Sequence, residues 1–215
     1  MSLEDACDAG LLERARCGDA QAWGTLLAGH QERLARVALF RLDPRLRGRI
    51  DAADVMQETM MAATARREEF FAQASQSLFL WLRWMVGNTL LELHRHHLGA
   101  QMRDARRELP IDRDDANEAD MTREALVAQL TAGATGPATA AGRAEIKARL
   151  NEAIGEMSAG DREVIALRHF EQLTSAEAAQ VLGIEERAAA KRYLRALERL
   201  REALVGVSGF TELRP

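Results

Sequence analysis

Cationic side chains recur at helical spacing close to the C-terminal end of the chain. Arg187, Lys191 and Arg195 follow one another every four residues, which places them on one face of a helix. Such a row binds phosphates along its length, and its first members reach base edges when a helix enters the major groove. Acids in the same segment offset much of this charge: Glu185, Glu186, Glu198 and Glu202. The pattern favours a DNA-reading helix, and a solvated amphipathic helix is the alternative.

The segment before this row carries the local signals of a short helix and a tight turn. Thr174 and Glu177 fit the S/T-x-x-E capping box, in which each side chain accepts a backbone N–H of the other residue. They predict a helix over 175–182, after which Gly183 supplies the turn and a second helix starts near Glu185. Two helices that meet through alanines across a glycine turn form a helix-turn-helix, whose second helix enters the major groove.

Apolar residues at spacings of three and four extend over most of the chain, and no stretch alternates for long enough to predict a strand. The sequence therefore predicts an all-α protein with two small helical domains, at 1–108 and 144–204. Residues 109–143 are first acidic and then small and Pro-containing, which predicts a flexible linker with at most one short helix, near Arg123–Leu130. We expect residues 205–215 to form a loose tail.

The composition excludes several classes of function. The chain has 29 Lys and Arg against 33 Asp and Glu, a net charge of -4, so no global positive field draws it onto nucleic acid or an anionic membrane. Its cysteines, Cys7 and Cys17, have the spacing of unpaired thiols in a reducing compartment. The apolar run Leu78–Leu93 is interrupted by polar residues and is shorter than the roughly 20 residues that span a bilayer. Since the N-terminus also has no signal-peptide pattern, we expect a cytoplasmic protein without a membrane span.

No pattern in the sequence indicates a cofactor or an enzyme. His94, His96 and His97 lie close together, but two of them are adjacent and diverge on a helix, so we expect a polar surface and no metal site. The sequence has no phosphate-binding loop, no nucleophile elbow and no HExxH motif. We therefore predict a protein that is not an enzyme and that needs no cofactor.

The C-terminal motifs resemble the promoter-reading domain of a known family. The stretch Asp161–Ile184, DREVIALRHFEQLTSAEAAQVLGI, and the KRYLRALERL that follows are similar to this domain in the extracytoplasmic-function (ECF) group of bacterial sigma-70 factors. The resemblance implies that the second helix of the motif reads an upstream, -35 type element in duplex DNA. The residues that it assigns to this contact are Arg187, Lys191, Arg192, Leu194 and Arg195.

The stretch Asp51–Ala63, DAADVMQETMMAA, resembles the helix with which these sigma factors dock on the β′ clamp of RNA polymerase. Asp54, Gln57 and Glu58 match the polar docking positions. Their i, i+3 and i+4 spacing puts them on one helix face, and two carboxylates with an amide suit an arginine-bearing partner surface. A solvated face of an amphipathic helix is the alternative for this stretch taken alone.

The stretch Leu78–His97, LFLWLRWMVGNTLLELHRHH, resembles the family's helix that binds the melted downstream, -10 type element, on the pattern W-L-x5-N-x6-R. Aromatic faces stack on freed bases, an Asn side chain bonds base edges and arginines follow the phosphates. We expect Trp81 to lie mostly in the core and Trp84 nearer the surface. The candidates for single-strand contact are Phe70, Phe71, Ser75, Arg83, Trp84, Asn88 and Arg95.

The resemblance implies a promoter-specificity subunit that docks on core RNA polymerase, through the β′ clamp and the β subunit, and helps to melt promoter DNA. It also implies an anti-sigma factor as a possible partner. A stand-alone dimeric helix-turn-helix regulator is the alternative, and it would bind a palindromic site without polymerase. A row of arginines around a Pro-Gly loop is open to contact with DNA, with polymerase or only with solvent: Arg41, Arg45, Arg47 and Arg49.

Overall fold

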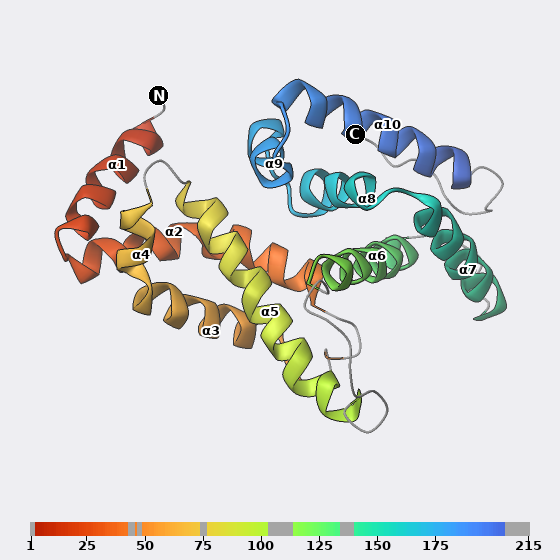
Figure 1. Cartoon of the computed structure of the whole chain (residues 1–215), viewed down its shortest axis with the longest axis horizontal. Coiled ribbons are helices and arrows are strands. Elements are labelled where there is room, and N and C mark those ends of the chain that lie inside the picture. The colour runs from red at the N-terminus through yellow and green to blue at the C-terminus, as the bar shows by residue number, and fades with distance from the viewer. Residues whose placement is uncertain are drawn as a thin grey trace. The chain divides into compact units, whose positions relative to one another are not determined.

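The computed structural model describes residues 3–42, 46, 49–73, 77–102, 114–133 and 140–204, and this part of the chain contains helices and no strand (Figure 1). The predicted all-α fold class is therefore confirmed. The chain divides into two units, of which unit 1 consists of Met1–Leu39 and Leu46–Met102 and unit 2 of Phe40–Arg45 and Arg103–Pro215. Of the helices that the structure describes, none is long and apolar enough to cross a membrane.

Unit 1 holds the helices of the N-terminal half. They are α1 Leu3–Arg16, α2 Ala20–Arg41, α3 Ala52–Ala65, α4 Arg67–Ala72 and α5 Leu78–Met102. The last two residues of α2, Phe40 and Arg41, belong to unit 2. Within unit 1, α3 packs along α5.

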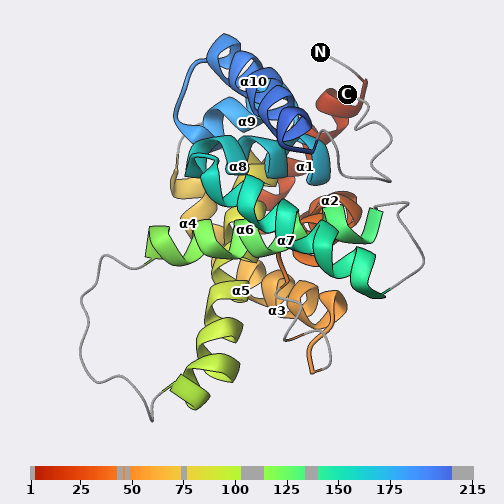
Figure 2. The same cartoon turned by 90° about the vertical axis from the view of Figure 1, so that its right-hand side faces the viewer.

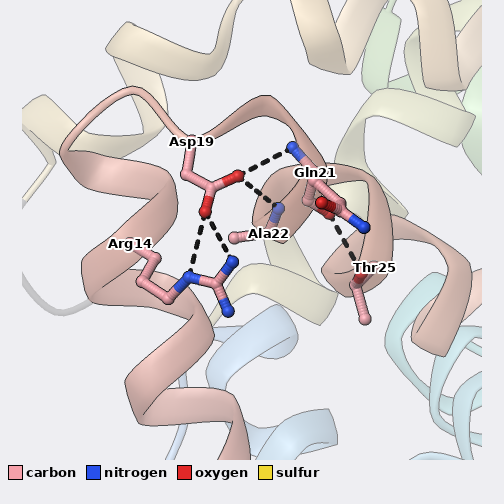
Figure 3. Close-up of polar contacts among 5 residues, drawn as sticks. All are labelled: Arg14, Asp19, Gln21, Ala22 and Thr25. Carbon is pink, nitrogen blue, oxygen red and sulfur yellow. Dashed lines mark hydrogen bonds and ion pairs between the residues drawn. The ribbon is translucent and has the colours of Figure 1, made fainter.

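A single aspartate fixes the turn between α1 and α2 (Figure 3). Asp19 Oδ1 accepts the backbone N–H groups of Gln21 and Ala22 at 2.9 and 3.0 Å, so it caps the start of α2. Its other oxygen accepts two hydrogen bonds from the guanidinium of Arg14, at 2.7 and 2.9 Å. The Ala22 N–H and then the Arg14 guanidinium lower the pKa of Asp19, so this carboxylate is ionised at neutral pH and ties α1 to α2.

An aromatic cluster forms part of the core of unit 1. The ring of Trp23 on α2 lies 5.9 Å from Phe70 and 5.8 Å from Phe71 on α4, and 6.3 Å from Trp81 on α5, between centroids. Aromatic pairs favour such non-parallel arrangements over a face-to-face sandwich. Each pair stabilises the fold by about 0.5–1.5 kcal/mol, in addition to the contribution of its buried area. The cluster holds α2, α4 and α5 together and so fixes the side of α5 that faces the core.

Unit 2 holds the helices of the C-terminal half. They are α6 Asp114–Gly133, α7 Ala140–Glu156, α8 Ala159–Ile165, the π-helix η1 Ala166–Phe170, α9 Ser175–Leu182 and α10 Glu186–Leu204. Figures 1 and 2 show α10 running along α8 and α9. The unit has a continuous apolar core, to which α7 contributes Leu150 and Ile154 and α10 contributes Ala196 and Leu200.

The helix α6 differs from the flexible linker expected over 109–143. It is 20 residues long, and it packs against α7 and α8. Ala125, Leu126, Val127 and Leu130 lie in the core of unit 2, so the expected short helix near Arg123–Leu130 is the buried part of a longer one. The flexible linker is not confirmed, and its limits stay predictions because residues 103–113 and 134–139, like the expected tail 205–215, lie outside the described residues.

A buried ion cluster lies in the interior of unit 2. Arg41 is 6 % exposed, and its Nε donates to Oε1 of Glu171, which is fully buried, at 2.5 Å. Its Nη2 donates to Glu163 and its Nη1 to Thr122 Oγ1. The hydroxyl of Thr122 in turn donates to Glu163 Oε2 at 3.0 Å. Arg41 is therefore an interior cation of unit 2 in this structure, and it does not lie on the surface where the arginine-rich loop was expected.

Candidate nucleic-acid and polymerase interfaces

The turn that positions the candidate duplex-reading helix forms as the sequence predicts. The backbone N–H of Thr174 donates to Glu177 Oε2 at 2.8 Å, and the N–H of Glu177 donates to Thr174 Oγ1 at 3.1 Å, which confirms the capping box. Gly183 ends α9 with a φ of 63°, in the left-handed region that favours glycine. The N–H of Ile184 donates to the carbonyl of Ala179 at 3.0 Å, which satisfies one of the last free carbonyls of the helix.

One face of α10 anchors this helix to the rest of unit 2. Ala189, Ala196 and Leu200 are buried on this face. Arg168 of η1 donates to the carbonyl of Leu173, and its guanidinium lies 5.5 Å from the ring centroid of Tyr193. Arg168 thus joins η1 to α10 and to the residue before the α9 cap.

The opposite face of α10 carries the candidate residues for duplex DNA. Arg187, Lys191 and Arg195 are exposed, as their four-residue spacing predicts. Leu194 is 62 % exposed among them. The face therefore presents three cations around one apolar side chain, a combination that suits phosphates, base edges and a thymine methyl group.

Two other arginines of α10 interact with unit 2 itself. The guanidinium of Arg192, a candidate for DNA contact, is half-buried beside Gly160, where an added Cβ would meet its Nη1 at 3.0 Å. Arg199 donates to Asp161 Oδ2 at 2.5 Å. The sequence does not separate these arginines from Arg187 and Arg195, because their partners come from α8, more than 30 positions earlier in the chain for each pair.

The structure places the candidate polymerase contacts together on the exposed face of α3. Asp54, Gln57 and Glu58 are all exposed, and the opposite face of the helix buries Val55, Met56, Thr59 and Ala63. Asp54 has a second role that the family pattern does not reveal. Its Oδ2 accepts the backbone N–H of Asp51 at 3.0 Å, while Asp51 caps the N–H of Asp54 at 2.9 Å. The carboxylate that is a docking candidate therefore also helps to start its own helix.

A groove borders this polar face of α3. It has a volume of about 910 Å³ and is lined by residues of α2 and α3. Its lining residues are Gln31, Ala35, Ala52, Ala53, Met56, Gln57, Met60, Met61, Thr64 and Ala65. Gln57 belongs both to the groove and to the candidate docking face, so the two surfaces are continuous.

The candidates for single-strand contact divide into exposed and buried residues. Trp84 is 47 % exposed and Trp81 is 2 % exposed, which agrees with the expectation that Trp81 lies mostly in the core and Trp84 nearer the surface. Arg95 is exposed, and Phe71 and Asn88 are half-buried.

Two of the candidates have interior positions that differ from the expected contact with DNA. Phe70 lies in the aromatic cluster, 5.2 Å from the ring of Trp81, and Arg83 is also buried. Both follow from the packing of α4 and α5, which the sequence pattern does not define. Ser75 lies outside the described residues.

The sequence motifs do not identify Arg66, the residue after α3. Its guanidinium carbon lies 5.3 Å from the ring centroid of Trp84, and its Nη2 lies 2.7 Å from Oε2 of Glu69. No spacing rule brings Arg66 to Trp84, because Arg66 lies between α3 and α4 and Trp84 lies on α5. Among the described residues, no group of three or more His, Cys, Asp or Glu side chains has an arrangement that could hold a metal ion.

The comparisons with known proteins agree with this arrangement. Residues 147–200 match the family model described as "Sigma-70, region 4". The solved structure of CnrH in complex with the cytosolic domain of CnrY matches with 26% sequence identity and a TM-score of 0.51, over 93% of this chain and 97% of that chain. The structure of the sigma factor RpoE from Bartonella quintana, in complex with the anti-sigma factor NepR, matches with 19% identity and a TM-score of 0.48, over 87% and 99%. No curated protein sequence matches.

The family match covers the helix-turn-helix whose capping box, glycine turn and basic face are described above. The likeness to the CnrH structure extends over 93% of this chain. The region 4 match and the likeness to CnrH together support a protein of the sigma-70 family of bacterial sigma factors, within its extracytoplasmic-function group.

Proposed function

We propose that this sigma factor is the promoter-specificity subunit of a bacterial RNA polymerase, which docks on the core enzyme, recognises -35 and -10 type elements and helps to melt DNA. The observation that carries the proposal is the outward face of α10. Arg187, Lys191 and Arg195 are exposed on the first half of the second helix of a helix-turn-helix. This is the part of the motif that enters the major groove, where arginine and lysine read guanine edges.

Docking on the core enzyme is assigned to α3. Its exposed face presents two carboxylates and an amide, Asp54, Glu58 and Gln57, to a basic surface of the β′ clamp. Charge-assisted hydrogen bonds between carboxylates and arginines are stronger than neutral ones, and they fix orientation as well as affinity. An anti-sigma factor is a second proposed partner, since the CnrH structure, which covers most of this chain, also contains a bound protein domain.

Capture of the melted strand is assigned to α5. Trp84 offers an exposed aromatic face, on which a base can stack for about 1–3 kcal/mol. Asn88, one turn further along the same helix, has a donor and an acceptor for a base edge, and Arg95 carries a charge for the backbone. Stacking accepts any base, so sequence preference at this element comes from the polar neighbours.

The net charge of -4 fits a protein that binds DNA as part of a larger complex. Non-specific DNA binding is dominated by phosphate neutralisation, and an acidic chain gains little from it. Polymerase then supplies most of the attraction to DNA, while α10 and α5 supply the choice of sequence.

The test is the binding of core RNA polymerase by a variant with an altered α3 face. Because Asp54 also caps α3, we would combine Asp54→Asn, whose amide oxygen can still accept the Asp51 N–H, with Glu58→Lys. The matched control is Glu152→Gln with Glu156→Lys, which makes the same charge change on exposed positions of α7. We expect the wild type and the control to co-elute with core polymerase and the α3 variant to elute alone.

A stand-alone dimeric helix-turn-helix regulator is the alternative function. It would keep its DNA binding in the α3 variant, would not co-elute with core polymerase in any form and would bind a palindromic duplex by itself. Co-elution of the α3 variant to the same extent as the control would refute the assignment of docking to α3.

A further inference from the structure

The guanidinium of Arg66 contacts both the exposed ring of Trp84 and the carboxylate of Glu69, which come from different elements. Arg66 follows the end of α3, Glu69 lies on α4 and Trp84 lies on α5. The guanidinium of Arg66 lies 5.3 Å from the centroid of the indole, within the range of a cation–π interaction. Arg66 Nε donates to Glu69 Oε2 at 2.9 Å, and Nη2 lies 2.7 Å from the same oxygen. Glu69 thus holds the guanidinium close to the aromatic face.

This arrangement is open to solvent and easily exchanged. The side chain of Arg66 is 40% exposed and that of Glu69 is 54% exposed. Exposed ion pairs contribute little to stability because water and salt screen them. A phosphate oxygen has the geometry and the charge to replace the carboxylate as acceptor from the planar guanidinium. Glu69 therefore keeps the Arg66 guanidinium in position, and breaking this ion pair costs little free energy.

We propose that Arg66 is a phosphate-binding residue of the single-strand site, and that Glu69 occupies the place of the DNA phosphate until a strand arrives. A base stacks on Trp84, and the phosphate of that nucleotide takes the guanidinium of Arg66 from Glu69. The proposal rests on the assignment of α5 to the melted strand and adds to it the ligand atom, a backbone phosphate, and the residue that binds it. Glu69 then acts as a competitor that weakens capture of strands that do not also stack.

The pKa directions of the pair agree with this geometry. The hydrogen bond to Glu69 raises the pKa of Arg66, and the hydrogen bond from Arg66 lowers the pKa of Glu69. Both groups are therefore charged at neutral pH, so the exchange of carboxylate for phosphate needs no proton transfer. Glu92 on α5 adds a further negative charge near Arg66, which also raises the pKa of Arg66.

The chain supplies its own optical probe for the test. Of its three tryptophans, Trp23 and Trp81 are each 2% exposed and Trp84 is 47% exposed, so quenching of tryptophan fluorescence by a bound strand reports on Trp84. The full-length chain would be titrated with a random-sequence single-stranded DNA of 12 nucleotides at several salt concentrations. In a plot of the logarithm of the binding constant against the logarithm of the salt concentration, each phosphate of a single strand that the protein neutralises contributes about -0.7 to the slope.

The variants isolate the role of Arg66. We expect Arg66→Gln to make the slope about 0.7 less steep, the loss of one phosphate contact, and to keep the quenching. Arg67→Gln is the matched control, because it removes the same charge from the adjacent position, and it should leave the slope close to that of the wild type. Glu69→Gln should bind up to about fivefold more tightly, since the competing carboxylate is gone.

Three results would overturn the proposal. They are an unchanged slope in Arg66→Gln, an equal loss of slope in Arg67→Gln, and absence of binding by the wild-type chain. Co-elution with core polymerase, measured on the same samples, separates this inference from the proposed function. If Arg66→Gln changes the slope in a chain that does not bind polymerase, the sigma function fails and the phosphate site stands. If the chain binds polymerase with an unchanged slope, only the phosphate site fails.

Discussion

Replacing Arg41 by methionine should destabilise unit 2 strongly. The guanidinium of Arg41 is buried, and it bonds two carboxylates and a hydroxyl. Methionine keeps most of the aliphatic volume but removes the charge, so Glu171, which is fully buried, and Glu163 lose their cation. Thr122 Oγ1 still donates to Glu163. The variant therefore removes a charged hydrogen-bond donor from two carboxylates in the interior of unit 2.

The size of the effect follows from the cost of removing one partner of a buried ion pair. Removal of one partner of a buried ion pair costs about 3–5 kcal/mol. That is a large part of the total stability of about 5–15 kcal/mol of a typical domain. For a unit of this size, each kcal/mol lost lowers the midpoint temperature of unfolding by about 4 °C. The midpoint of unit 2 should therefore fall by about 12–20 °C.

Differential scanning calorimetry of the full-length chain measures this change. Arg36→Met is the control, because Arg36 pairs with the exposed Glu32 one turn away on α2, and the loss of such a pair costs about 0–1 kcal/mol. A triple variant, Arg41→Met with Glu163→Gln and Glu171→Met, also removes the two carboxylate charges and should recover much of the stability. A transition of Arg41→Met within about 2 °C of the wild type would show that the cluster does not stabilise unit 2, and the reasoning would fail.

Other predictions concern the helix-turn-helix and its neighbourhood. Thr174→Ala should lower the free energy of unfolding by about 1 kcal/mol in urea titrations, because it removes the cap of α9, and an unchanged midpoint would contradict the cap. If the side chain of Leu194 contacts a thymine methyl group, Leu194→Ala should weaken binding of holoenzyme to promoter DNA about fourfold. Replacement of that thymine by deoxyuridine should then have no further effect on binding by the variant. Burial lowers the pKa of His169 below its ordinary value of 6.5, so the unfolded chain binds the proton first. The stability contribution of the neutral ring is therefore present above about pH 6.5 and is lost as the pH falls below it. His169→Gln should abolish this pH dependence of the free energy of unfolding, measured by denaturation curves from pH 5 to pH 8.

Local signals in the sequence predicted the turn and the two helices of the helix-turn-helix. The capping box and Gly183 act within a few residues, so their geometry depends little on the rest of the fold. We also expected Trp81 to be more buried than Trp84, and the structure agrees. Because residues three apart share a helix face, the packing of α5 against its neighbours decides which of the two rings is buried.

The features that the sequence did not reveal depend on distant partners. Arg41 bonds Glu163 and Glu171, which are 122 and 130 positions away in the chain. The helix α6 has an acidic, small-residue composition typical of a linker, but α7 and α8 cover its few apolar residues. Arg66 reaches Trp84 only because α3 and α5 pack together. Tertiary packing, which no local rule contains, decided each of these cases.

Run-off transcription with purified core RNA polymerase tests the central claim most directly. Pooled genomic fragments would be transcribed by core enzyme alone, by core enzyme with this chain, and by core enzyme with the variant of the α3 face. If the chain is a promoter-specificity subunit, discrete new transcripts should appear with the wild-type chain only, and they should begin downstream of shared -35 and -10 type elements. Transcription that is the same with and without the chain, together with tight binding of the free chain to a palindromic duplex, would contradict the sigma function.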